Sequence, residues 1–395
     1  MTRIVGALAA VFLVTLAVTA QSRNGRDIFR FDTFGDEQLW TTTLQMHTVI
    51  PKLTPRAALG LGLKVDVEAL PLSVITALKA DPTLLDNAAV TLQLLRLNAV
   101  VGIIGRVGPD DSLQSVGTTC ALCHSTVDDS FVPGVGRRLD GWPNRTLKVG
   151  EIIASSPVLT EAQRAVYKSW KPGFYDPRFT AFKGLAEGFE ILNPTSFPVV
   201  IPPAYGLRGV EFETFTGDGP ISYWNAYVGI TQMGGRGDFH DPRIPLTVDQ
   251  PPPDLVTPQL PALLAYQLSL RAPDPPKGSF NVVAAQRGRH LFNGQARCDA
   301  CHTPPNFTDV LRGPSRDVPF LHAPAETQME PEYASRSVTG QYRTTPLRGI
   351  WQHPPYFHDG SAADLLAVVN HYNRVLSLGL NDAQKADLVE YLKSL

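Results

Sequence analysis

The chain has 395 residues, 43% of them hydrophobic, so it is long enough for two or three domains with ordinary cores. Its 35 Lys and Arg residues nearly balance 37 Asp and Glu residues, which excludes recognition of nucleic acid or an acidic membrane surface through bulk charge. The 32 glycines and 34 prolines predict many turns and few long strands. We therefore expect a mainly helical fold with long loops and little sheet.

The first twenty residues have the pattern of an export signal. One cation, Arg3, precedes an apolar run from Ile4 to Val18, and small residues follow up to Ala20. The run is shorter than the ~20 residues of a membrane-spanning helix, which favours a cleaved signal peptide at 1–20 over an uncleaved anchor. The mature protein is expected in a bacterial periplasm.

A long N-terminal domain is expected at 21–248. Its segments 74–78 and 90–104 have a helical pattern of apolar residues and precede the first cysteines. This domain is expected to end where a Pro-rich stretch begins.

All four cysteines belong to two Cys-x-x-Cys-His motifs, at Cys120, Cys123 and His124 and at Cys298, Cys301 and His302. Disulfides or a zinc ribbon would not require a histidine after each pair, and the 174 residues between the pairs far exceed the roughly 15 to 20 of a zinc-ribbon spacer. Haem c attachment does require a histidine after each pair, because the thiols add to the haem vinyl groups and the next imidazole becomes the proximal iron ligand. We therefore predict two covalently bound haem c groups, each holding one iron.

The remainder of the chain is expected to form a connector and a second haem domain. Pro-rich stretches around a short helix at 263–270 predict a semi-rigid connector at 249–279. In the C-terminal domain, 280–395, a helix at 282–292 leads to the second motif and an amphipathic helix closes the chain. Two such helices crossing over a haem are typical of a compact cytochrome c domain.

A faint internal duplication accompanies the two motifs. Residues 202–219 and 345–360 both contain Leu-Arg-Gly, an aromatic-rich turn and Asp-Gly, with one residue inserted. The similarity favours two cytochrome units related by duplication. Chance is the alternative, because Gly, Pro and aromatic residues are plentiful.

Three segments of the C-terminal domain carry a family signature: 343–350 (RTTPLRGI), 355–361 (PYFHDGS) and 370–373 (NHYN). They resemble the di-haem cytochrome c peroxidase family, which includes the enzyme that matures methylamine dehydrogenase. The resemblance implies an electron-transfer haem in the C-terminal domain and a peroxide-reducing haem in the N-terminal domain. It also implies a redox partner protein and a small oxidant, hydrogen peroxide or dioxygen.

The family places a sixth ligand of the C-terminal haem about fourteen residues after the histidine of the His-Asp-Gly loop, a Met or a Tyr. Fourteen residues after His358 stands Tyr372. His371 is an equal alternative, His358 and Met329 are further candidates, and Tyr372 could instead be a packed helix residue.

The first motif departs from the family pattern. The family has a distal histidine some sixteen residues after the motif, but the segment 131–145 contains none. Met233 and His240 are the remaining candidates, with His240 favoured as a surface residue. No glutamate can be assigned the family's acid-base role, because neither Glu187 nor Glu190 stands in a recognisable position.

Aromatic spacing suggests a weaker similarity to the rubber oxygenases, which are larger di-haem relatives. Trp224 stands 100 residues after His124, beside Tyr223, and Phe239 follows fifteen residues later. Trp224 and Phe239 are thus candidate catalytic residues, although aromatic clusters more often form core. Trp142 is a second possible electron relay, and four arginines are candidate haem-propionate partners or surface charges: Arg137, Arg138, Arg145 and Arg348.

Two functions follow from these observations. The first is a periplasmic di-haem oxidoreductase of the peroxidase type, in which the second haem takes up electrons and the first reduces peroxide or activates dioxygen. The alternative is a di-haem electron-transfer protein with no substrate chemistry.

Overall fold

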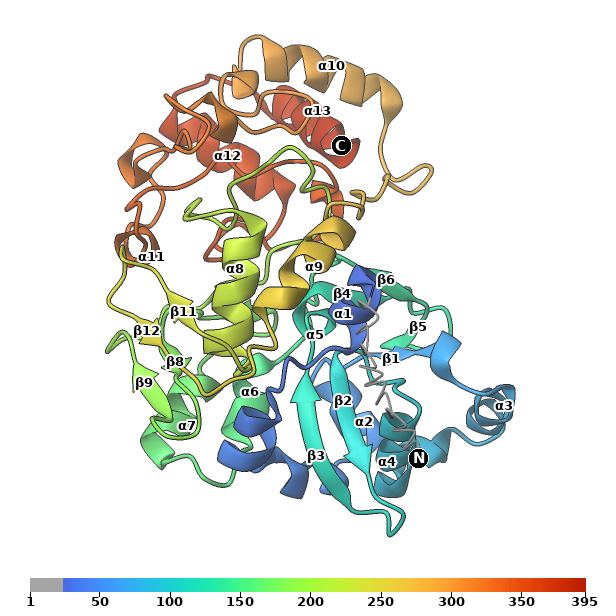
Figure 1. The fold of residues 1–395 in the computed structure, drawn as a ribbon. Helices are drawn as coiled ribbons and strands as arrows, with labels where there is room; N and C mark the ends of the chain where they lie inside the picture. Colours follow the sequence, from blue (N-terminus) through green and yellow to red (C-terminus); the bar gives the residue numbers. More distant parts are fainter. Residues whose placement is uncertain (1–23) are drawn as a thin grey trace, which may run out of the picture.

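The computed structural model describes residues 24–395, so the expected signal peptide lies outside the described residues. Within that range the chain is mainly helical, and its strands form six two-stranded sheets. None of the described helices is long and apolar enough to cross a membrane. Figure 1 shows the helices α10 (Val282–Asn293), α12 (Leu365–Val375) and α13 (Asp382–Lys393) grouped at one end, with the N-terminal elements at the other. The expected mainly helical fold is confirmed.

The N-terminal part contains seven described helices before the middle of the chain: α1 (Gly25–Phe31), α2 (Pro55–Gly60), α3 (Leu72–Ala80), α4 (Ala88–Arg96), α5 (Ala121–His124), α6 (Val149–Ala154) and α7 (Glu161–Lys168). The helix predicted at 74–78 is α3. The helix predicted at 90–104 is wrong in its second half, because Asn98 takes the left-handed conformation with φ 49° and ends the helix. The chain then enters strand β2 (Ile103–Val107).

The longest sheet leads directly to the first motif. Strand β2 pairs antiparallel with β3 (Leu113–Thr118), which ends two residues before Cys120. The other strands pair as β1 (Val65–Asp66) with β5 (Val135–Gly136), β4 (Ser125–Val127) with β6 (Arg138–Asp140), β7 (Phe174–Tyr175) with β10 (Val199–Val200), β8 (Thr180–Phe182) with β9 (Phe189–Ile191), and β11 (Phe239–His240) with β12 (Thr247–Val248).

The predicted connector contributes to the core. Its helix, α9 (Leu260–Gln267), lies with α8 (Ile221–Tyr227) between the two ends of the molecule (Figure 1). α9 crosses α1 so closely that a Cβ added at Gly25 would lie 1.9 Å from the Ala262 carbonyl oxygen. Ile28 and Phe29 of α1 and Leu263 of α9 are buried in one cluster. The segment 249–279 is thus anchored to the N-terminal part.

Short turns complete the chain. α11 (Glu332–Ser335) follows the second motif. Two π-helical turns span Gln38–Thr43 and Val228–Gln232, and 3₁₀ turns span Met46–Thr48, Ile50–Lys52, Val67–Ala69, Pro82–Asp86, Thr257–Gln259, Cys298–Ala300, Val310–Arg312, Pro324–Glu326 and Ile350–Gln352.

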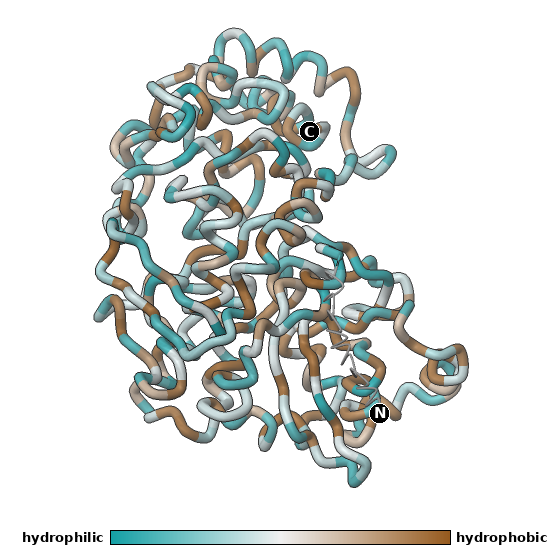
Figure 2. Tube along the Cα trace, in the orientation of Figure 1, coloured by the Kyte–Doolittle hydropathy of each residue, from teal (hydrophilic) through white to brown (hydrophobic). Residues whose placement is uncertain are grey.

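Helices α10 and α13 cross at a glycine, and both were predicted from their apolar patterns. Asn281 caps α10, and Asn381 caps α13 with a capping box. A Cβ at Gly288 would lie 2.0 Å from the Asp387 carbonyl oxygen, so only glycine permits this approach. Figure 2 shows many hydrophilic residues at this end of the molecule, while Phe292 of α10 and Leu388 of α13 are buried in one cluster.

Replacing Gly288 by Ala should destabilise the protein by about 1–3 kcal/mol, because the added methyl group must push the two helices apart. The measurement is the free energy of unfolding from denaturant titration. Gly60→Ala is the matched control, since no atom lies within 4 Å of the added Cβ there. Equal stability of the two variants would contradict the tight crossing.

Candidate functional site

The first motif follows a strand end that is held by a buried carboxylate. The Thr118 backbone N–H and hydroxyl both donate to Asp36 Oδ2, at 2.9 and 2.5 Å. Burial raises the pKa of Asp36 well above its usual range. The next turn includes Cys120, whose carbonyl accepts from the His124 backbone N–H at 3.1 Å. Cys120 and His124 are therefore held on one helical turn.

His124 is oriented by a carbonyl far away in the sequence. Its Nδ1 lies 3.1 Å from the Pro202 oxygen. Burial lowers the pKa of His124 to about 4, so the ring is neutral at pH 7 and Nδ1–H donates to that oxygen. The lone pair therefore stays on Nε2, as in metal-ligating histidines whose other nitrogen is held by a carbonyl.

The second motif repeats this arrangement on a tighter turn. Arg297, with a left-handed φ of 49°, precedes the 3₁₀ turn that begins at Cys298. The His302 Nδ1 lies 3.0 Å from the Phe307 carbonyl oxygen, and burial lowers the pKa of His302. The neutral ring again keeps its lone pair on Nε2.

Both motifs line one cavity of about 520 Å³, although 174 residues separate them. Much of its wall is aliphatic or aromatic, and the four cysteines of the described chain form no disulfide. A covalently attached haem c needs an apolar wall, two thiols and an imidazole lone pair. The residues at each motif fit that group.

Cys301, Asp309 and His322 offer an alternative use of a motif cysteine, because their ligand atoms lie within 4.8 Å of one another. Both ring nitrogens of His322 are already bound, however, to Asp309 at 3.1 Å and to Glu326 at 2.8 Å. Hydrogen bonding, above all to Asp309, raises the pKa of His322 to about 11. In this structure His322 therefore serves as a hydrogen-bonded link between Asp309 and Glu326.

Tyr372 and His371 are neighbours on α12 but have different surroundings. Tyr372 lines the cavity, and burial raises its pKa, with a further rise from the nearby Cys301 and Cys298. The His371 Nε2 instead lies 2.7 Å from the Thr327 carbonyl oxygen, and its Nδ1 lies 3.3 Å from an Arg374 guanidinium nitrogen. His371 does not line the cavity. Of the two, Tyr372 is beside the second motif.

His358 and Met329 both line the cavity. The Tyr342 hydroxyl donates to the Glu330 carbonyl at 2.6 Å, so its oxygen accepts from the His358 Nε2–H at 3.0 Å. The imidazole also stacks on the Tyr342 ring, with 4.6 Å between centroids. These contacts hold His358 as a packed, hydrogen-bonded residue of the wall.

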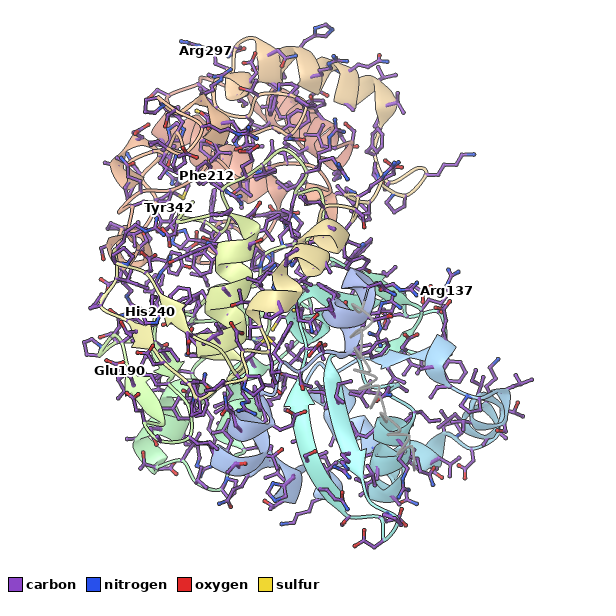
Figure 3. The ribbon with its side chains drawn as sticks, viewed as in Figure 1. Arg137, Glu190, Phe212, His240, Arg297 and Tyr342 are labelled. Carbon is purple, nitrogen blue, oxygen red and sulfur yellow. The ribbon has the colours of Figure 1, made fainter. Side chains whose placement is uncertain are left out.

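The two candidates for the distal side of the first motif, Met233 and His240, lie in different surroundings. Met233 lines the cavity. His240 is exposed on β11 (Figure 3), and its Nε2 lies 2.9 Å from Asp249 Oδ1. Of these two residues, only Met233 faces the cavity.

The two candidate catalytic residues, Trp224 and Phe239, also differ in whether they line the cavity. Trp224 lines the cavity, and its buried Nε1 has no hydrogen-bond partner among the described residues. The Arg178 guanidinium lies 5.5 Å from its ring centroid. Phe239 is buried behind it, against Tyr223 and Tyr227, and is not part of the cavity wall.

The four candidate arginines have different partners. Arg137 is exposed at the edge of the N-terminal part and pairs with Asp128 (Figure 3). Arg138 pairs with the buried Asp66, away from the cavity. Arg348 lines the cavity and donates to the Pro305 carbonyl, and Arg145 lines the cavity close to His124.

One carboxylate of the cavity was missed from the sequence. Glu187 and Glu190 both pair with Lys183 outside the cavity. Glu213 lines the cavity, pairs with Arg343 at 3.0 Å, and has a buried Oε1 without a partner in the described chain. Burial raises its pKa. Its position six residues after Leu207, in the first of the two similar loops, was the signal in the sequence that could have indicated it.

Comparison with known proteins identifies relatives that share part of the chain. No protein-family model matches. A stretch of 153 residues is 28% identical to cytochrome-c peroxidase IdrP2 of Denitromonas iodatirespirans, covering 30% of this chain and 42% of that protein. A stretch of 125 residues is 31% identical to methylamine utilization protein MauG of Methylorubrum extorquens, covering 28% of this chain and 34% of MauG.

This chain is similar to the cytochrome c peroxidases and MauG. The predicted resemblance is confirmed at modest identity, and the matched part spans less than half the length of these relatives. The weaker similarity to rubber oxygenases stays a prediction.

Solved structures with a partial match include a hydrazine synthase and a MauG-like protein. A hydrazine synthase of Kuenenia stuttgartiensis has a TM-score of 0.31 at 20% identity, covering 50% of this chain and 72% of that one. A MauG-like protein associated with microbial copper homeostasis has a TM-score of 0.27 at 23% identity, covering 35% and 56%. These scores are too low to establish a shared fold.

Proposed function

We propose that this protein is a periplasmic di-haem c-type oxidoreductase of the cytochrome c peroxidase type. The second site takes up single electrons from a redox partner protein, and the first site reduces hydrogen peroxide or activates dioxygen. The observation that carries the proposal is the shared cavity, which both motifs line with their histidines in the same tautomer.

Haem c bound at each motif would supply the redox chemistry. The residues of the chain set its ligation and access. His124 and His302 present Nε2 as proximal ligands. Tyr372, beside the thiols of the second motif, would hold the second haem as its sixth ligand, and its neighbour His371 is hydrogen-bonded to Thr327. The first site stays open to a small oxidant.

Reduction of one peroxide to two waters consumes two electrons and two protons, so the cavity needs a proton carrier. We assign this role to Glu213, since its Oε1 is buried and unpartnered in the described chain and its pKa is raised. Trp224, with its free indole N–H, and the edge-to-face pair of Trp142 and Trp351, with 5.9 Å between centroids, are proposed to carry electrons between the sites.

One observation favours the alternative of an electron carrier without substrate chemistry. Met233 lines the cavity, and a thioether bound to the first iron would close that site too. The two functions therefore differ in the coordination of the first haem.

Electron paramagnetic resonance of the ferric protein tests the proposal. We expect one high-spin signal that hydrogen peroxide converts and one low-spin signal that it leaves unchanged. Met233→Leu is the matched variant, and its high-spin signal should equal that of the wild type. Two low-spin signals that are indifferent to peroxide, carbon monoxide and azide would refute the peroxidase function. In that case, a high-spin signal appearing in Met233→Leu would identify Met233 as the closing ligand.

A further inference from the structure

Arg145 is half-buried, and its guanidinium lacks an anionic partner among the described residues. It lies on the turn between the first motif and α6, and its side chain lines the cavity. Its Nε and Nη1 are buried without a hydrogen-bond partner in the described chain, and its Nη2 lies 3.4 Å from His353 Nδ1. Two of the three nitrogens of the guanidinium thus have unused donors.

Other buried arginines of the described chain differ from Arg145, because each is paired with a carboxylate. The pairs are Arg138 with Asp66, Arg178 with Asp218, Arg336 with Asp176, and Arg343 with Glu213. An unpaired buried charge is unfavourable, so proteins generally supply a counter-charge. For Arg145 none of the described carboxylates does so.

The neighbours of Arg145 are neutral at pH 7. Burial raises the pKa of Tyr205 and raises that of Tyr356 to about 12, and it lowers the pKa of His353 to about 3. Burial also lowers the pKa of Arg145 to about 10, which still leaves the guanidinium charged. The positive charge therefore remains uncompensated by the protein.

The two similar loops, 202–219 and 345–360, differ in the residue that faces each arginine. Glu213 stands six residues after Leu207, and His353 stands six residues after Leu347. The Glu213 carboxylate reaches Arg343 at 3.0 Å, whereas the neutral His353 ring reaches Arg145 at 3.4 Å. The residue at this loop position is thus a carboxylate beside Arg343 and a neutral imidazole beside Arg145.

We propose that Arg145 is a carboxylate-binding site of the cavity and that its occupant is a propionate of the haem attached at the first motif. This inference rests on the proposed function only for the presence of that haem. The propionates are the anionic groups of haem c, and a guanidinium fork matches a carboxylate with two parallel hydrogen bonds. Arg145 directly follows Asn144, whose backbone N–H donates to the Cys123 carbonyl at 2.9 Å, which assigns Arg145 to the first site.

The test is the reduction potential of each haem in the intact protein, measured by spectroelectrochemistry. Arg145→Gln should lower the potential of the first haem by about 59 mV or more, a tenfold change in its one-electron equilibrium, because the uncompensated propionate stabilises the ferric state. The second haem should keep its potential. Arg137→Gln, at the exposed pair with Asp128, is the matched control and should change neither potential.

A second variant changes His353, the residue of the C-terminal half that contacts Arg145. His353→Glu should place a carboxylate on Arg145, as Glu213 does on Arg343, and should also lower the potential of the first haem by competing with the propionate. This variant keeps Arg145 and tests the site even if Arg145→Gln fails to fold.

Three results would overturn the inference. They are unchanged first-haem potentials in both variants, an equal shift in Arg137→Gln, or a wild-type potential that falls and saturates with added acetate, which would mean that the guanidinium is free to bind an added carboxylate. Peroxide plays no part in these measurements. A wild-type protein inert to peroxide would refute the proposed function and leave the propionate site standing, whereas unchanged potentials with normal peroxide reactivity would refute the site alone.

Discussion

Replacing Cys120 and Cys123 by Ser should halve the covalently bound haem, from two groups per chain to one. Serine cannot form the thioether bonds, and the apolar cavity wall alone cannot keep a haem through denaturation. The measurement is the mass of the denatured protein after export, together with its haem absorbance. The same variant should lose the signal that responds to peroxide, because the first site is the proposed site of peroxide reduction.

The matched variant changes Cys298 and Cys301 to Ser. It should also retain one haem, but it should lose the low-spin signal and keep binding of small ligands at the first site. Identical spectra for the two variants would contradict the proposed asymmetry of the sites. A wild-type chain with fewer than two covalently bound haems would contradict the prediction from the motifs.

Replacing Tyr372 by Phe should change the ferric spectrum of the second haem from six-coordinate to high-spin and leave the first haem unaffected. The phenylalanine keeps the ring that packs in the cavity and removes only the hydroxyl. Burial raises the pKa of this hydroxyl in the protein alone. We therefore expect it to lose its proton only when it binds the positively charged iron. Absorbance and electron paramagnetic resonance report the change.

His371→Gln is the control for this experiment, since it alters the adjacent residue whose Nε2 lies 2.7 Å from the Thr327 oxygen. We expect the spectrum of that variant to match the wild type. A changed spectrum in His371→Gln with none in Tyr372→Phe would reverse the assignment. If neither variant changes the spectrum, Met329 and His358 become the candidates.

The helices next to the second motif could be predicted because their signals are local. Asn281 and Asn381 stand one residue before α10 and α13, and the apolar positions of each helix repeat with the helical period. The prediction at 90–104 was wrong after residue 96 because a left-handed Asn98 ends α4, and an asparagine within an apolar run carries only a weak signal for that.

The surroundings of the candidate residues depended on segments far apart in the chain. Tyr372 and His371 are indistinguishable by spacing, but adjacent residues of a helix point in different directions, and only the fold brings the Thr327 carbonyl to His371. Glu213 was not predicted, because the similarity of the two loops indicated its position but not its partner. That partner, Arg343, is 130 residues further along the sequence.

The sequence by itself determined the predicted attachment sites, because two thiols and an imidazole within five consecutive residues carry all the groups that one covalent haem requires. Only the tertiary structure decided how these groups are used. The carbonyl that orients His124 comes from Pro202, and the neutral ring beside Arg145 comes from His353, 208 residues further on. Ligand orientation and charge balance are properties of neighbours in space, and folding alone brings these neighbours together.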